Sequence, residues 1–204
     1  MGLIDREAYA ETQETTIKTS SSATMRPGTY LCRIQKVVTD WETTRGEKRG
    51  VDATQCVMLV LDVDDGEFAG RYSSEFYDDP SKDKKHAIYL SFKPLAYGFL
   101  KRNCRCIDEA NHGFSSLDAV DSGHWMEFIG RRVWVLFDGR EYTYEGRDGV
   151  SVRPSFLVFE DDELEPTVEL LDGNKVKWSE YTAAQKASTA AAAPSAYAND
   201  DIPF

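Results

Sequence analysis

The order of elements in this sequence, three strand-like segments, one helix-like segment and two further strand-like segments, predicts an all-β protein with one helix. That order is the one expected of a five-stranded OB-fold barrel. The strand-like segments are rich in β-branched and aromatic residues and end at turn signals, whereas apolar residues of the helix-like segment recur at helical spacing. The chain has 204 residues, which suits one such domain with additional segments at both ends.

The first three strands are expected at 29–41, 55–63 and 70–77. The first follows an Arg-Pro-Gly turn signal and contains apolar residues interleaved with polar ones. The second is nearly all apolar at its centre, as in a strand covered on both faces. The third follows an Asp-Asp-Gly turn and contains several aromatic residues at alternate positions.

The helix is expected to begin near Pro94, because proline suits the first turn of a helix. The apolar residues that follow then form a stripe at helical spacing. Two more strands are expected at 132–138 and 150–160, and the polar connection at 139–149 is interpreted as a loop. Ligands of the OB fold bind on the face of strands 2 and 3 and on the loops after strands 1 and 4.

Segments of different composition flank this core. A polar first segment predicts a flexible N-terminal arm, and the segments after the last strand predict a disordered acidic C-terminal tail. A small hairpin around Asp172 and Gly173 is left open within the tail. The expected organisation is an arm at 1–25, an OB-fold domain at 26–160, an acidic segment at 161–181, an Ala/Ser linker at 182–198 and a partner-docking tip at 199–204.

Charge is distributed unevenly along the chain. The formal net charge is −11, from 24 Lys and Arg against 35 Asp and Glu, which on its own argues against a partner rich in phosphates. Residues 26–158, however, carry 19 cations and 21 anions, whereas residues 159–204 carry three cations and ten anions. The predicted domain is therefore close to neutral, and the acidic excess belongs to the predicted tail.

No apolar run approaches the ~18 residues that a membrane span needs, and the N-terminus has no signal-peptide pattern. We therefore expect a cytoplasmic protein without a membrane partner, in the bacterial host if the chain is encoded by a phage. Cys32, Cys56, Cys104 and Cys106 are interpreted as buried free thiols. The Cys104-x-Cys106 pair with His112 nearby is a weak zinc signal, so neither a metal nor a cofactor is expected.

The sequence lacks the phosphate-binding, nucleophile-elbow and His-rich metal motifs that would indicate an enzyme, so we expect no enzymatic activity. Binding of single strands instead needs aromatic faces for base stacking beside cations that follow the backbone. Phe76 and Trp134 are expected in the core, because alternation must bury one face of a strand. The DNA-binding candidates are Trp41, Arg45, Lys48 and Arg49 at the first loop, Arg71, Tyr77, Lys84 and Lys85 around the third strand, and Arg140, Tyr142, Tyr144 and Arg147 between the last two strands.

The last five residues have the properties of a docking peptide. Ile202 and Phe204 can fill an apolar pocket, Pro203 reduces the entropy lost on ordering, and Asp200 and Asp201 can meet cations at the pocket rim. This segment resembles the acidic tip of bacterial single-stranded DNA-binding proteins. The resemblance implies that these residues recruit replication, recombination or repair enzymes.

The body of the chain resembles a second family. The segments PGTY at 27–30, DGEFAGR at 65–71 and GRRVWV at 130–135 resemble a family of phage proteins with an OB-type core. That family is commonly taken to bind single-stranded DNA, which implies a phage-type, sequence-nonspecific single-stranded DNA-binding protein that protects DNA. The alternative is an OB-fold adaptor that binds proteins and no DNA. Homo-oligomer formation is left open.

Overall fold

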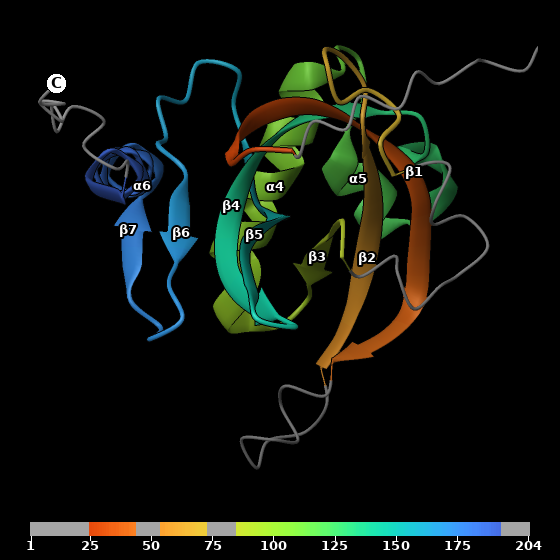
Figure 1. Cartoon of the computed structure of the whole chain (residues 1–204). Helices are drawn as coiled ribbons and strands as arrows, with labels where there is room; N and C mark the ends of the chain where they lie inside the picture. The colour runs from red at the N-terminus through yellow and green to blue at the C-terminus, as the bar shows by residue number, and fades with distance from the viewer. Residues whose placement is uncertain (1–24, 44–53, 73–84, 193–204) are drawn as a thin grey trace, which may run out of the picture.

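The computed structural model describes residues 25–43, 54–72 and 85–192, and their fold is mostly β-sheet with a few helices (Figure 1). The coarse prediction of a β-rich protein is therefore confirmed. The strands are β1 (Gly28–Thr43), β2 (Thr54–Val63), β3 (Ala87–Ser91), β4 (Arg132–Tyr144), β5 (Arg147–Val158), β6 (Thr167–Glu169) and β7 (Lys175–Lys177). The helices are η2 (Pro94–Ala96), α4 (Tyr97–Ala110), α5 (Ser116–Asp121), η3 (Trp125–Phe128) and α6 (Trp178–Ala192).

β1 is the strand that organises the sheet. One of its edges pairs antiparallel with β2, and the first part of its other edge pairs antiparallel with β4. β3 then adds to β2, and β5 adds to β4. Within the described residues no ladder joins β3 to β5, so the predicted closure into a five-stranded barrel is not observed there.

The sequence of β5 gives a reason for the open edge. The register with β4 passes from Leu136 opposite Phe156 to Phe137 opposite Pro154, which leaves Ser155 as an extra residue on β5. Such a bulge bends a strand and interrupts its pairing. Pro154 also has no N–H to donate, which restricts proline to edge strands and bulges. β5 is therefore built to pair on the β4 side and to stay open towards β3.

The core lies between the inward faces of the strands and the helices α4, α5 and η3. Alternate residues of the strands fill it, and Cys106 and Ile107 of α4 and Phe128 of η3 complete it. Met25 is 3% exposed and belongs to this core, so the core includes the last residue of the predicted arm. All four cysteines are buried and free, as expected.

The predicted third strand at 70–77 is wrong over the part that the structure describes. Residues 70–72 belong to a turn, and the third strand is β3 instead. The Asp62 carboxylate accepts hydrogen bonds from the N–H groups of Val63 and Tyr72, 2.9 Å each, and so ties the chain back onto the end of β2. The Tyr72 ring then stacks on the buried His86 ring. Residues 73–77 lie outside the described residues.

The predicted loop at 139–149 is also wrong, because β4 and β5 continue through it as a long hairpin. Glu145 and Gly146 form its tip, with positive φ values of 50° and 74°. Two consecutive residues with positive φ match a type I′ turn, the turn whose twist suits a two-residue hairpin. The alternation of the strands therefore extends to Tyr144 and resumes at Arg147.

The predicted disordered tail is folded as far as Ala192. β6 pairs in parallel with β4 at Gly139 and Arg140, next to the end of the β1 pairing, and β7 and α6 follow it. Figure 1 shows β6, β7 and α6 beside β4, on the side away from β2. The linker predicted at 182–198 is thus helical up to Ala192, because alanine has the highest helix propensity of all residues. Residues 193–198 lie outside the described residues.

A shared carboxylate joins three strands at the other end of β4. Arg33 of β1 lies directly opposite Arg132 of β4. The Asp64 carboxylate, just after β2, lies between the two cations: its Oδ1 is 2.6 Å from Arg33 Nε and its Oδ2 is 2.6 Å from Arg132 Nε. Without this carboxylate the two guanidinium groups would repel each other across the ladder.

We predict that Asp64→Asn lowers the free energy of unfolding by about 2 kcal/mol, the usual range for hydrogen bonds to charged groups. Asparagine preserves the shape of the side chain but removes the charge that offsets the two arginines. Chemical denaturation measures the loss. Glu67→Gln, which neutralises an exposed acid in the following turn, is the control and should change the free energy by less than about 0.5 kcal/mol. Equal stability of the two variants would contradict a structural role for Asp64.

Candidate functional site

The β4–β5 hairpin places four predicted DNA-binding residues on one face. Residues directly opposite each other in an antiparallel ladder share a face, and the face alternates along each strand. Arg140, Tyr142 and Tyr144 are alternate residues of β4, and Arg147 lies opposite Tyr144. All four side chains are exposed, the two tyrosines by 47% and 67%. We call Arg140, Tyr142, Tyr144 and Arg147 the hairpin face.

A glycine shapes this face. Gly149 lies opposite Tyr142, and a Cβ built on Gly149 would be 2.7 Å from both Cζ and Oη of the tyrosine. The ring therefore lies over the glycine backbone, at a position where any other residue would displace it. This packing holds the Tyr142 ring across the hairpin with one side towards solvent, which is the arrangement that base stacking requires.

The carboxylates near the hairpin are placed mainly away from this face. Glu141 and Asp148 alternate onto the other face, where Thr143 Oγ1 donates a 2.6 Å hydrogen bond to Asp148 and the Glu141 carboxylate accepts from the N–H of Leu171. The Glu169 carboxylate of β6 is the exception, since its Oε1 is 3.5 Å from Nη2 of Arg140 on the hairpin face. The Arg140 side chain is 61% exposed and that of Glu169 is 36% exposed, and ion pairs so open to solvent contribute little energy.

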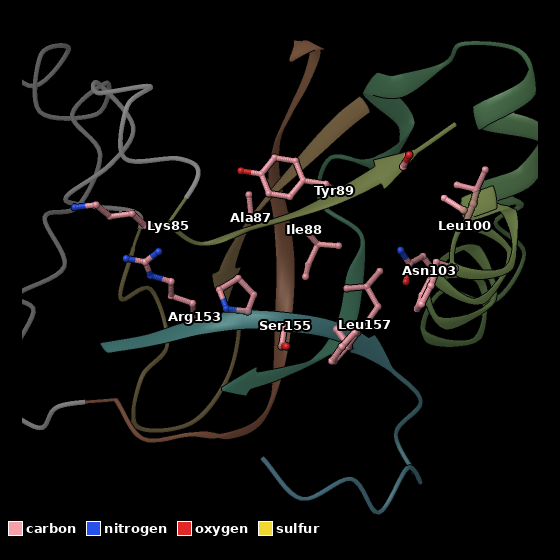
Figure 2. A pocket seen from close by; sticks show the side chains of 14 residues that line it. Lys85, Ala87, Ile88, Tyr89, Leu100, Asn103, Arg153, Ser155 and Leu157 are labelled. Atoms are coloured by element: carbon pink, nitrogen blue, oxygen red, sulfur yellow. The ribbon is translucent and has the colours of Figure 1, made fainter. Parts of the chain in front are cut away.

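A groove of about 390 Å³ lies between β3 and β5, where the sheet stays open (Figure 2). We call it the seam groove. Figure 2 shows Lys85 and Arg153 at one end of it and Leu100 and Asn103 at the other. Its lining residues are Lys85, Ala87, Ile88, Tyr89 and Ser91 of β3 and the residues before it, Ala96, Phe99, Leu100 and Asn103 of η2 and α4, and Arg153, Pro154, Ser155, Phe156 and Leu157 of β5.

Sequence reasoning missed most of the seam groove. Lys85 was predicted as a DNA-binding residue, but Tyr89, Arg153 and Phe156 were not. Tyr89 and Phe156 lie on strands far apart in the sequence, and both remain more than a third exposed. An exposed aromatic residue at an alternate position of a strand is the signal that could have identified them, once the true strand at 87–91 was recognised.

The other predicted site residues are not brought together with these. Arg71 is exposed in the turn after β2 and lines neither surface. Trp41 lies on β1 opposite Cys56, but its side chain is outside what the structure describes. Trp134, predicted in the core, is half-buried on β4. The remaining predicted residues lie outside the part of the chain that the structure describes. They are the core candidate Phe76 and the site candidates Arg45, Lys48, Arg49, Tyr77, Lys84, Asp200, Asp201, Ile202, Pro203 and Phe204.

A second hollow, between α4 and α5, has mixed charge. Lys101, Arg105, Asp108 and Asp121 all line it, so it favours neither an anion nor a cation. Burial raises the pKa of the Cys104 thiol beside it to about 11, with the Asp108 charge adding to the effect. This thiol is therefore protonated at neutral pH, and a protonated thiol is a poor nucleophile and metal ligand.

The described residues contain no group of three or more His, Cys, Asp or Glu side chains placed to hold a metal ion. Across the same residues, no helix has the length and apolar character to cross a membrane. Comparison with protein-family models gives no match to this chain, and comparison with curated proteins gives none either. The hairpin face and the seam groove are therefore the features from which a function can be inferred.

We predict that Gly149→Ala displaces the Tyr142 ring with little loss of stability. The clash involves the far end of a side chain that can rotate, and Gly149 does not have a positive φ, so the change in unfolding free energy should stay within about 1 kcal/mol. Nuclear Overhauser contacts between the ring and residue 149 report the displacement. Ser151→Ala, opposite Arg140 on the same face, is the control and should preserve them. Unchanged ring contacts in Gly149→Ala would contradict the packing.

Proposed function

We propose that this chain is an OB-type protein that binds single-stranded DNA without sequence preference and so protects it. The observation that carries the proposal is the hairpin face, where two exposed tyrosines alternate along β4 between two arginines. Every base has a π-face, so stacking on tyrosine tolerates any sequence, and arginines beside the rings can follow the phosphates.

The strand order supports the OB-type part of this proposal. The sheet runs β3-β2-β1-β4, with β5 on the remaining edge of β4, so β3 and β5 are the two ends of a five-stranded path. Both ends line the seam groove, and α4 contacts β3, β4 and β5. A five-stranded, partly open barrel with a helix packed across the strand ends is the arrangement expected of an OB fold.

The strongly negative net charge is compatible with this activity. Phosphate binding depends on the local potential of a surface, and that potential falls off over a Debye length of about 8–10 Å at physiological salt. Among the carboxylates of the hairpin, Glu145 lies at the tip and Glu141 and Asp148 lie on the face opposite the tyrosines. Asp138 lies on the tyrosine face but further from the tip, where its carboxylate accepts a hydrogen bond from the N–H of Thr167. The acidic excess is concentrated after residue 159 and partly consists of residues outside the described part of the chain.

We predict that the full chain binds oligo(dT) and that Tyr144→Ala lowers its affinity by about 1–3 kcal/mol, or roughly 5- to 150-fold, the usual contribution of one stacked base. Fluorescence anisotropy of a labelled oligonucleotide measures the affinity. Tyr97→Ala is the matched control, because Tyr97 is 55% exposed but lies at the start of α4, outside both the hairpin face and the lining of the seam groove. Arg147→Ala should reduce the slope of log affinity against log salt by about 0.7.

Two results would contradict the proposal. The first is equal or stronger binding of duplex DNA, because a stacking surface needs unpaired bases. The second is no binding of any strand at low salt, which would favour the alternative of an OB-fold adaptor that binds only proteins. An affinity for single strands that does not depend on salt would contradict the role of the arginines.

The proposal has a second part, recruitment of replication, recombination or repair enzymes by Asp200, Asp201, Ile202, Pro203 and Phe204. We predict that deletion of Phe204 alone abolishes capture of such enzymes, because a buried aromatic anchor dominates the energy of a small interface. Pull-down with purified host enzymes measures the effect. Removal of Phe204 should leave the affinity for oligo(dT) unchanged, which separates the two parts. Full capture without Phe204 would contradict recruitment by the tip.

A further inference from the structure

The seam groove combines aromatic surfaces, cations and polar groups in one hollow. Tyr89 of β3 and Phe156 of β5 are its exposed aromatic residues on the two sides of the open seam, and Phe99 of α4 adds a third, 66% exposed. Its charged lining residues are Lys85 and Arg153, with no carboxylate among the lining residues. A ligand that suits this lining has a flat apolar ring and a negative charge.

We propose that the seam groove receives one base of a bound single strand, with the adjoining phosphate on Lys85 and Arg153. This inference rests on the proposed function, and it adds a second contact site at a distance from the hairpin face. The groove volume of about 390 Å³ lies at the small end of the range for ligand pockets, which suits a single nucleotide unit.

The position of the cations gives the direction from which the strand would arrive. Lys85 and Arg153 lie together at one end of the groove (Figure 2). From Arg153 the outward-facing positions of β5 continue through Ser151 and Gly149 to Arg147 of the hairpin face. The six residue steps of β5 from Arg153 to Arg147 span about 20 Å. The seam groove and the hairpin face therefore form one path along β5.

Arg153 is available for a phosphate. Asp138 lies opposite it on β4, but the Asp138 carboxylate accepts a 2.7 Å hydrogen bond from the N–H of Thr167. Among the ion pairs of the described residues, none includes Lys85 or Arg153. The β5 bulge contributes as well, because the extra residue Ser155 also lines the groove.

The far end of the groove can contact the base edge. Asn103, half-buried on α4 at this end, supplies a hydrogen-bond donor and an acceptor among apolar residues. Ser155 of β5 adds a hydroxyl group between the two ends of the groove (Figure 2). Burial raises the pKa of the Tyr89 hydroxyl, which keeps the ring neutral and suited to stacking at any physiological pH. A base in this groove would therefore contribute more to affinity than its phosphate alone.

The test compares oligo(dT) with an abasic strand of equal length, because both carry the same phosphates but only the first carries bases. We expect Phe156→Ala to weaken oligo(dT) binding about 5- to 150-fold and to leave abasic binding unchanged. Arg153→Ala should weaken both strands alike. Tyr97→Ala and Lys101→Ala are the matched controls, since neither residue lines the groove and both are exposed. Equal effects of Phe156→Ala on the two strands, or no effect, would overturn the inference.

Photo-cross-linking of the unaltered chain to an oligonucleotide with 5-iodouracil provides a measurement that needs no variant. Cross-links at Tyr89, Phe99 or Phe156 support the inference, and cross-links confined to the hairpin face overturn it while leaving the proposed function intact. If the unaltered chain binds no single strand at all, both proposals are wrong. The two failures are therefore distinguishable.

Discussion

The arrangement of this protein depends on β1 being shared by two partners. β1 pairs with β2 on one edge and with β4 on the other, and the Asp64 carboxylate joins all three at Arg33 and Arg132. Because β3 and β5 are then added to opposite partners, they become the two ends of one curved path. The bulge and Pro154 keep these ends from pairing within the described residues. The seam groove is thus a consequence of how β1 is paired.

The hairpin face has a related origin. β1 covers the edge of β4 only as far as Phe137, while β4 continues to Tyr144. A bare edge of this length would invite pairing with another chain. β6 covers part of it by pairing at Gly139 and Arg140, and β7 and α6 follow from there. The hairpin can therefore extend beyond the core with a partly covered edge and an exposed outer face.

The sequence predicted the β-rich class, the approximate positions of four strands and the start of the helix, because these depend on local periodicity and turn residues. It also predicted all four residues of the hairpin face, although it assigned them to a loop, since their polar character obscured the alternation. The seam groove depends on tertiary structure, because Tyr89 and Phe156 come to line one hollow only after the sheet has formed. The alanine-rich segment before Ala192 was ambiguous by composition, because linkers and helices both use alanine.

The fold of the C-terminal segment changes how its negative charge acts. On a free tether, acids after residue 159 would compete with a ligand for any cationic surface. In the folded segment Glu165 is 3.2 Å from Lys177 and Glu169 is held beside Arg140, so these acids have fixed neighbours. Competition by the described acids is therefore local. A phosphate that approaches Arg140 has to displace the Glu169 carboxylate. Arg147 and Arg153, in contrast, form no ion pair with a described residue. A single DNA strand that follows β5 would thus meet these two arginines away from β6, along the path that joins the hairpin face to the seam groove.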